Sequence, residues 1–128
     1  MKKVILIVDD DTDYLFQMKL KVEYFGFEAI TAEGQVEAEE LMQTLKPDLA
    51  ILDLMMENED SGFILSYKLK NQYPDLPVII TTAVTAETGM VFDHNSETDK
   101  NWIKADLFLD KGIRTDLLEK EIRKLLKI

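Results

Sequence analysis

Five short apolar runs recur along the chain, and segments whose apolar residues repeat with the period of an α-helix separate them. The runs cover residues 3–8, 28–31, 49–52, 78–82 and 107–109. Such alternation is typical of βαβ units, which form a parallel sheet covered by helices. Four runs are nearly all apolar, as strands buried on both faces must be, whereas the second run is weaker and predicts an edge strand. The pattern predicts an α/β fold.

The segments between the runs predict the helices. The first helix follows three consecutive aspartates, and Gly26 is expected to end it because glycine readily adopts the left-handed conformation found after helices. Further helices are expected from Gly34 to just before Pro47, over residues 61–72, loosely over residues 97–104, and from an N-cap at Thr115. Every residue then belongs to one unit, without a linker.

Size and charge limit the possible functions. A chain of 128 residues with 46% hydrophobic content can bury the core of one domain, so residues 1–128 are expected to form a single domain with no output domain. The net charge of −10 opposes direct binding to nucleic acid or to an anionic membrane. The apolar run near the N-terminus is too short for a signal peptide or a membrane span, so a cytoplasmic location is expected.

Acidic or polar residues stand at the ends of four of the predicted strands. Asp9 and Asp10 follow the first run, Asp53 the third, Thr82 ends the fourth, and Lys111 comes just after the fifth. Ligands of open parallel sheets bind outside the carboxyl ends of the strands, so one fold would gather these side chains at one edge. Together they predict a site for a divalent cation and a phosphoryl group.

Taken as a set, these residues resemble the receiver domain of two-component response regulators. The resemblance covers essentially the whole chain, and it is carried by the acidic pair, by Asp53 within Leu52-Asp53-Leu54, by Thr82-Ala83 and by Lys111. It implies a flavodoxin-like (βα)5 three-layer sandwich around a five-stranded parallel sheet with strand order 2-1-3-4-5.

The resemblance also implies a role for each polar residue. Asp53 is the expected phosphoacceptor, and Lys111 is expected to neutralise charge on the transferred group. Thr82 would donate its hydroxyl to a phosphoryl oxygen once that oxygen is present. Phe108 occupies the position of the family's switch aromatic, which turns inward when the threonine moves.

Magnesium is the cofactor that the resemblance implies. Mg²⁺ prefers oxygen ligands and retains several waters, so two carboxylates and a main-chain carbonyl suit it. By resemblance these ligands are Asp10, Asp53 and the main-chain carbonyl of Met55, with Asp9 acting through a bound water.

The chain departs from the family pattern in three loops. Gly112 follows Lys111 where the family usually has proline after a cis bond, and a cis bond before glycine would cost roughly 3 kcal/mol. Glu57 stands where a proline is usual, and the interval from Thr82 to Lys111 is longer than usual. The loop geometry behind the predicted site is therefore expected to differ from that of the family.

The leading interpretation is a stand-alone receiver that is phosphorylated by a sensor histidine kinase or a phosphotransfer protein. It would signal through a downstream protein target, as a monomer or a phosphorylation-dependent dimer, and would catalyse only its own phosphorylation and dephosphorylation.

One alternative is a receiver-like interaction module that works without phosphorylation. Another is a magnesium-dependent phosphatase, but the haloacid-dehalogenase class needs an aspartate where this chain has Met55. A flavin carrier would need a phosphate-binding loop where the three aspartates stand.

Overall fold

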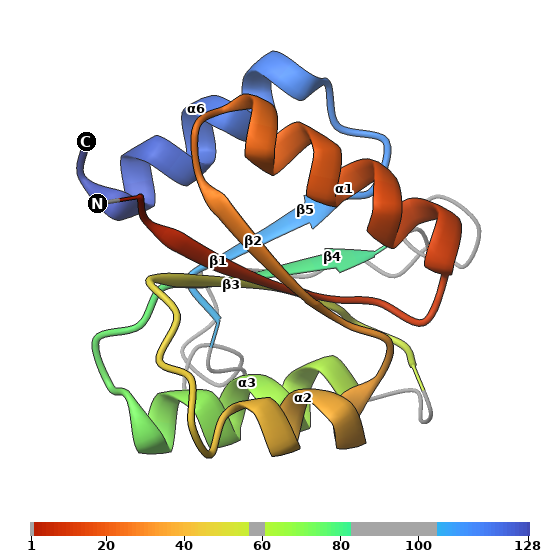
Figure 1. The fold of residues 1–128 in the computed structure, drawn as a ribbon, viewed down its shortest axis with the longest axis vertical. Helices are drawn as coiled ribbons and strands as arrows, with labels where there is room; N and C mark the ends of the chain where they lie inside the picture. The colour runs from red at the N-terminus through yellow and green to blue at the C-terminus, as the bar shows by residue number, and fades with distance from the viewer. Residues whose placement is uncertain (1, 57–60, 83–104) are drawn as a thin grey trace.

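The computed structural model describes residues 2–56, 61–82 and 105–128. Figure 1 shows a twisted central sheet between two layers of helices. Within the described residues the elements are β1 (Val4–Val8), α1 (Thr12–Tyr24), β2 (Glu28–Ala32), α2 (Gln35–Leu41), β3 (Leu49–Asp53), α3 (Ser61–Gln72), β4 (Val78–Thr82), β5 (Leu107–Asp110) and α6 (Thr115–Leu126). The three-layer α/β architecture predicted from the sequence is confirmed.

The five described strands form one sheet in the order β2-β1-β3-β4-β5, and every neighbouring pair is parallel. This is the order that the resemblance implied, with β2 at an edge. The register pairs Val8 with Leu52, Asp53 with Thr81, and Thr82 with Asp110. The last residues of these strands therefore lie side by side along the carboxyl edge of the sheet.

Two apolar layers fix the sheet between its helices, with α1 and α6 on one face and α2 and α3 on the other (Figure 1). Successive strand residues face opposite sides, so Ile7 and Ile51 pack into the cluster that contains α1 and α6 residues. Val8 and Leu52 pack into the cluster that contains residues of α2 and α3. Full burial of such a side chain contributes roughly 1.5–3 kcal/mol, so each strand is firmly held in register.

Four expectations need correction or lie outside the described residues. The helix after Gly34 ends at Leu41 and continues as turns toward Pro47. The N-cap of α6 is Arg114, not Thr115; its guanidinium can only donate hydrogen bonds, so it pairs with Asp116 instead of capping the helix. The residues of β5 are half-buried or exposed, because in the described sheet this strand pairs with β4 alone. The helix expected over 97–104 lies outside the described residues.

The remaining helix predictions agree with the structure. Asp11 is the N-cap of α1 and accepts hydrogen bonds from the backbone N–H groups of Asp13 and Tyr14. Gly26 follows that helix with a φ of 97°, a conformation that favours glycine. In the described part of the chain, no helix combines the length and the apolar character needed to cross a membrane.

Candidate functional site

Three carboxylates meet at the carboxyl edge of β1 and β3. Asp9, Asp10 and Asp53 each offer one oxygen, and these oxygens lie within 4.8 Å of one another. Asp9 is 1% exposed and Asp53 is 6% exposed, whereas Asp10 lies at the surface. Like charges at this separation repel each other strongly when they are shielded from water. Positive charge at this site would therefore reduce the repulsion among the three carboxylates.

Lys111 supplies part of that charge. Its ammonium lies 2.8 Å from Oδ2 of Asp9 and 3.3 Å from Oδ1 of Asp53. Its backbone N–H donates to the carbonyl of Thr82 at 3.1 Å, which fixes the start of the loop after β5. Burial of the ammonium opposes its charge, but its contacts with Asp9 and Asp53 outweigh burial and raise the pKa of Lys111. The side chain is therefore a permanent cation between two acids.

One lysine does not fully compensate the cluster. Burial, followed by the charge of Asp9, raises the pKa of Asp53 to about 7, although the charge of Lys111 acts in the opposite direction. A further cation beside Asp53 would favour its ionised form, which is the form that can attack an electrophile.

The residues fit a hard divalent cation. Asp9 Oδ1 accepts a hydrogen bond from the Asp11 N–H at 2.9 Å, but Asp9 Oδ2 is buried and has no hydrogen bond among the described residues. This oxygen forms an ion pair with Lys111 Nζ at 2.8 Å. Three carboxylate oxygens this close together match the all-oxygen ligand set that Mg²⁺ prefers.

The predicted ligand at Met55 and the predicted hydroxyl at Thr82 come from the same carboxyl edge of the sheet as the cluster. Met55 follows β3 by two residues, and its side chain is 40% exposed. Thr82 is buried as the last residue of β4. Its neighbour Thr81 is also buried, and the Thr81 hydroxyl donates to the carbonyl of Leu52 at 3.4 Å, in keeping with its predicted role in sheet packing.

Phe108 lies on the other face of β5, away from Lys111. Its half-buried ring packs against the apolar cluster of α2 and α3. The ring of Phe63 on α3 meets it edge-on, with ring centroids 6.1 Å apart and an angle of 68° between the ring planes. The predicted switch position therefore belongs to an aromatic pair in this structure.

Glycines stand at two positions behind the site, Gly62 in the first turn of α3 and Gly112 in the loop after β5. The N–H of Gly62 donates to the carbonyl of Leu54 at 2.8 Å, and a Cβ on Gly62 would lie 2.5 Å from the carbonyl oxygen of Asp53. Gly112 donates its N–H to Oδ1 of Asp110 at 2.6 Å, and the described residues contain no cis peptide bond. An aspartate-centred turn thus follows β5, where the family usually has a proline.

One residue at the site was not predicted. Tyr14 lies in the first turn of α1, and the Lys111 ammonium lies 4.7 Å from the centre of its ring. The available signal was its position just after the acidic run, in the helical turn nearest the carboxyl edge of the sheet.

Comparison with known families and proteins adds an independent observation. The pattern of the response regulator receiver domain matches residues 5–123. The chain belongs to this family. This receiver domain is 32% identical over 126 residues to the probable transcriptional regulator ycf27 of Cyanophora paradoxa, an alignment that covers 98% of this chain and 49% of that protein. It is 34% identical over 91 residues to the alkaline phosphatase synthesis transcriptional regulatory protein PhoP of Bacillus subtilis, covering 71% of this chain and 38% of that protein.

Solved structures agree with this assignment. A CheY-like response regulator receiver domain protein from Methanospirillum hungatei JF-1 has a TM-score of 0.79 and 26% identity, covering 99% of this chain and 96% of that one. The response regulator TrrA of Thermotoga maritima, solved in complex with Mg²⁺ and BeF, has a TM-score of 0.77 and 27% identity, covering 96% of this chain and 98% of that one. The receiver domain spans about half or less of the length of the two curated relatives described above.

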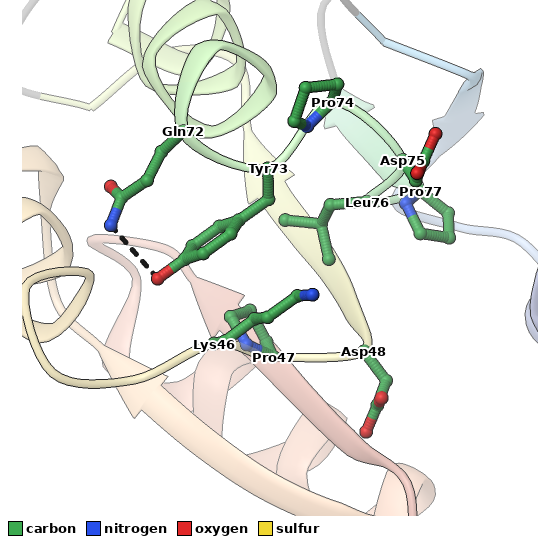
Figure 2. A pocket seen from close by; sticks show the side chains of 9 residues that line it. All are labelled: Lys46, Pro47, Asp48, Gln72, Tyr73, Pro74, Asp75, Leu76 and Pro77. Carbon is green, nitrogen blue, oxygen red and sulfur yellow. Dashed lines mark hydrogen bonds between the residues drawn. The ribbon is translucent and has the colours of Figure 1, made fainter.

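A hollow of about 300 Å³ lies at the opposite edge of the sheet, next to the amino ends of β3 and β4 (Figure 2). Gln72 donates to the hydroxyl of Tyr73 at 3.0 Å, and the Lys46 ammonium lies 5.6 Å from the centre of the Tyr73 ring. The residues that line the hollow are Lys46, Pro47, Asp48, Gln72, Tyr73, Pro74, Asp75, Leu76 and Pro77. None of these lining residues belongs to the predicted site.

Proposed function

We propose that this receiver domain accepts a phosphoryl group on Asp53 from a histidine kinase or a phosphotransfer protein, in a magnesium-dependent reaction. The observation that carries the proposal is the Lys111 ammonium, 2.8 Å from Asp9 and 3.3 Å from Asp53, in a cluster of three carboxylates. A buried acid between a fixed cation and two more acids suits nucleophilic attack on a phosphoryl group.

The proposed transfer forms one bond to phosphorus and breaks another. A carboxylate oxygen of Asp53 forms a bond to the phosphorus of a phosphohistidine as the N–P bond breaks. The electron pair of that bond stays on the imidazole nitrogen, and the ring leaves as neutral histidine when its other nitrogen carries a proton. Lys111 balances negative charge on the transferred oxygens, and the product is an aspartyl phosphate.

Asp10, Asp53 and the main-chain carbonyl of Met55 are the proposed magnesium ligands, with Asp9 holding a bound water. When bound, the ion supplies the positive charge that keeps Asp53 ionised and offsets its repulsion of the incoming phosphoryl group. The carboxylate oxygens of Asp9, Asp10 and Asp53, which lie within 4.8 Å of one another, support this assignment.

Thr82 and Phe108 are proposed to change position when Asp53 is phosphorylated. Thr82 is buried at the end of β4, next to β5, and its hydroxyl would turn to a phosphoryl oxygen on Asp53. Movement of Thr82 would free space for Phe108 and change its contact with Phe63 on α3. The altered surface would then bind a downstream protein, and the net charge of −10 supports a protein partner over nucleic acid.

Intact-protein mass spectrometry tests the proposal directly. Incubation with phosphoramidate and Mg²⁺ is expected to add the mass of one phosphoryl group, and a chelator or Asp53→Asn is expected to abolish the gain. Asp75→Asn is the matched control, because Asp75 is exposed at the opposite edge of the sheet. A gain that persists in Asp53→Asn, or no gain in the unmodified chain, would favour the phosphorylation-independent interaction module.

A further inference from the structure

Tyr14 occupies a defined place between helix α1 and the acidic cluster. Its backbone N–H donates to the N-cap side chain of Asp11 at 3.2 Å, which holds this residue in the first turn of α1. Its half-buried side chain packs against the apolar cluster that contains residues of α1 and α6. Anchored at both ends, the ring has little freedom to move away from the carboxyl edge of the sheet.

The face of this ring meets the lysine of the site. Lys111 Nζ lies 4.7 Å from the ring centroid, within the distance at which an ammonium is attracted to an aromatic face. The same nitrogen contacts Asp9 and Asp53. The ammonium is therefore held on one side by carboxylates and on another by the Tyr14 ring.

Negative charges lie near the Tyr14 side chain. Burial, followed by the charges of Asp9, Asp53 and Asp110, raises the pKa of Tyr14. The phenol consequently stays neutral at physiological pH, and its ring keeps the electron distribution that attracts a cation without adding another anion to the cluster.

We infer that Tyr14 is a positioning residue that holds the Lys111 ammonium beside Asp53 for phosphoryl transfer. The inference rests on the proposed function and adds a residue to it. A lysine has a long, flexible stem, and its attraction to Asp9 weakens whenever another cation shares that carboxylate. The Tyr14 ring is uncharged, so its attraction for the ammonium persists in that case and keeps the ammonium within reach of the transferred oxygens.

Nuclear magnetic resonance of the lysine side chains tests the position without any phosphorylation. The ring current of Tyr14 is expected to shift the ε-methylene resonance of Lys111 away from those of the other lysines. The shift should remain in Tyr14→Phe, which keeps the ring, and should disappear in Tyr14→Leu. Tyr24→Leu is the control on the same helix, because Tyr24 is 85% exposed and should leave the resonance unchanged.

Phosphorylation rates with phosphoramidate and Mg²⁺ test the role. Tyr14→Leu is expected to slow the rate roughly three- to tenfold, while Tyr14→Phe and Tyr24→Leu remain within about twofold of the unmodified chain. In a Lys111→Met background, Tyr14→Leu should cause no further loss, which a merely structural role would not predict. Should Tyr14→Leu fail to fold, Tyr14→Met serves as the ringless variant.

The outcomes separate this inference from the proposed function. If the unmodified chain gains no phosphoryl group, the proposed function fails, and the role of Tyr14 in transfer fails with it. If it is phosphorylated, but the ringless variant reacts at the same rate or leaves the Lys111 resonance unshifted, only the role of Tyr14 is overturned.

Discussion

Lys111 lies 2.8 Å from the buried carboxylate of Asp9, closer than its 3.3 Å distance from Asp53. The ammonium therefore compensates the most buried acid of the cluster, and Asp53 receives only part of its charge. Burial, followed by the charge of Asp9, still raises the pKa of Asp53, so the cluster can accommodate the positive charge of a metal ion as well.

Removal of the lysine should destabilise the protein as well as impair its chemistry. Lys111→Met is expected to lower the free energy of unfolding by about 1–3 kcal/mol without metal, because it leaves a buried carboxylate unpaired. Urea denaturation measures the change. Lys124→Met is the control at an exposed lysine of α6 and should alter stability by less than about 0.5 kcal/mol. Equal losses in the two variants would contradict the proposed pairing.

The ionisation of Asp53 should make the metal-free protein less stable as the pH rises. Its pKa is raised from 3.8 to about 7 in the folded state, so the stability that it contributes is complete below about pH 4 and is lost as the pH rises from there through about 7. Asp53→Asn stays neutral and should exceed the unmodified chain in stability by up to about 4 kcal/mol at pH 8, but by much less near pH 4. Urea denaturation with chelator at both pH values checks this, and a pH-independent difference would be evidence against it.

Magnesium should stabilise the folded protein through the three carboxylates. At about 100 times its Kd, a ligand that binds only the folded state adds about 2.7 kcal/mol to stability. A rise in Tm with added Mg²⁺ is expected for the unmodified chain and for Asp75→Asn, and a much smaller rise for Asp10→Asn. A similar rise in all three proteins would place the ion elsewhere.

A side chain at position 62 should destabilise the protein. A Cβ at this position would lie 2.5 Å from the carbonyl oxygen of Asp53 and 2.7 Å from Cα of Leu54, both of them backbone atoms. Gly62→Ala is expected to cost about 1–3 kcal/mol of stability and to slow phosphorylation, because β3 must shift. At Gly112 the nearest atom is a side-chain oxygen of Asp110 at 3.2 Å, so Gly112→Ala should cost less. The prediction fails if both alanine variants unfold at the same urea concentration.

The pairing of Phe63 with Phe108 should be measurable and should change with phosphorylation. Edge-to-face aromatic pairs contribute about 0.5–1.5 kcal/mol beyond burial, so a double-mutant cycle with Phe63→Leu and Phe108→Leu should show a coupling of this size. After modification of Asp53, ring-proton resonances of Phe108 are expected to move. Resonances that stay fixed while mass spectrometry shows full phosphorylation would exclude Phe108 as a switch.

Local sequence patterns predicted much of the architecture because they record burial directly. Apolar runs and helical periodicity identified the five strands and the helix faces, including Leu118 and Ile122, which are buried on α6. The left-handed conformation at Gly26 was also predicted, since few other residues adopt it readily. The predicted cap at Thr115 was wrong, because capping depends on backbone angles at Arg114 that residue type alone does not specify.

The sequence by itself determined which residues can carry charge at the carboxyl edge of a parallel sheet, because the apolar runs show where each strand ends in the chain. Only the tertiary structure decided how those residues share that charge. The distances from Lys111 to Asp9 and Asp53, the Tyr14 ring over the lysine and the contact of Phe63 with Phe108 join different elements of the fold. Such contacts depend on the packing of helices against the sheet, and no local pattern encodes the side-chain positions that packing produces.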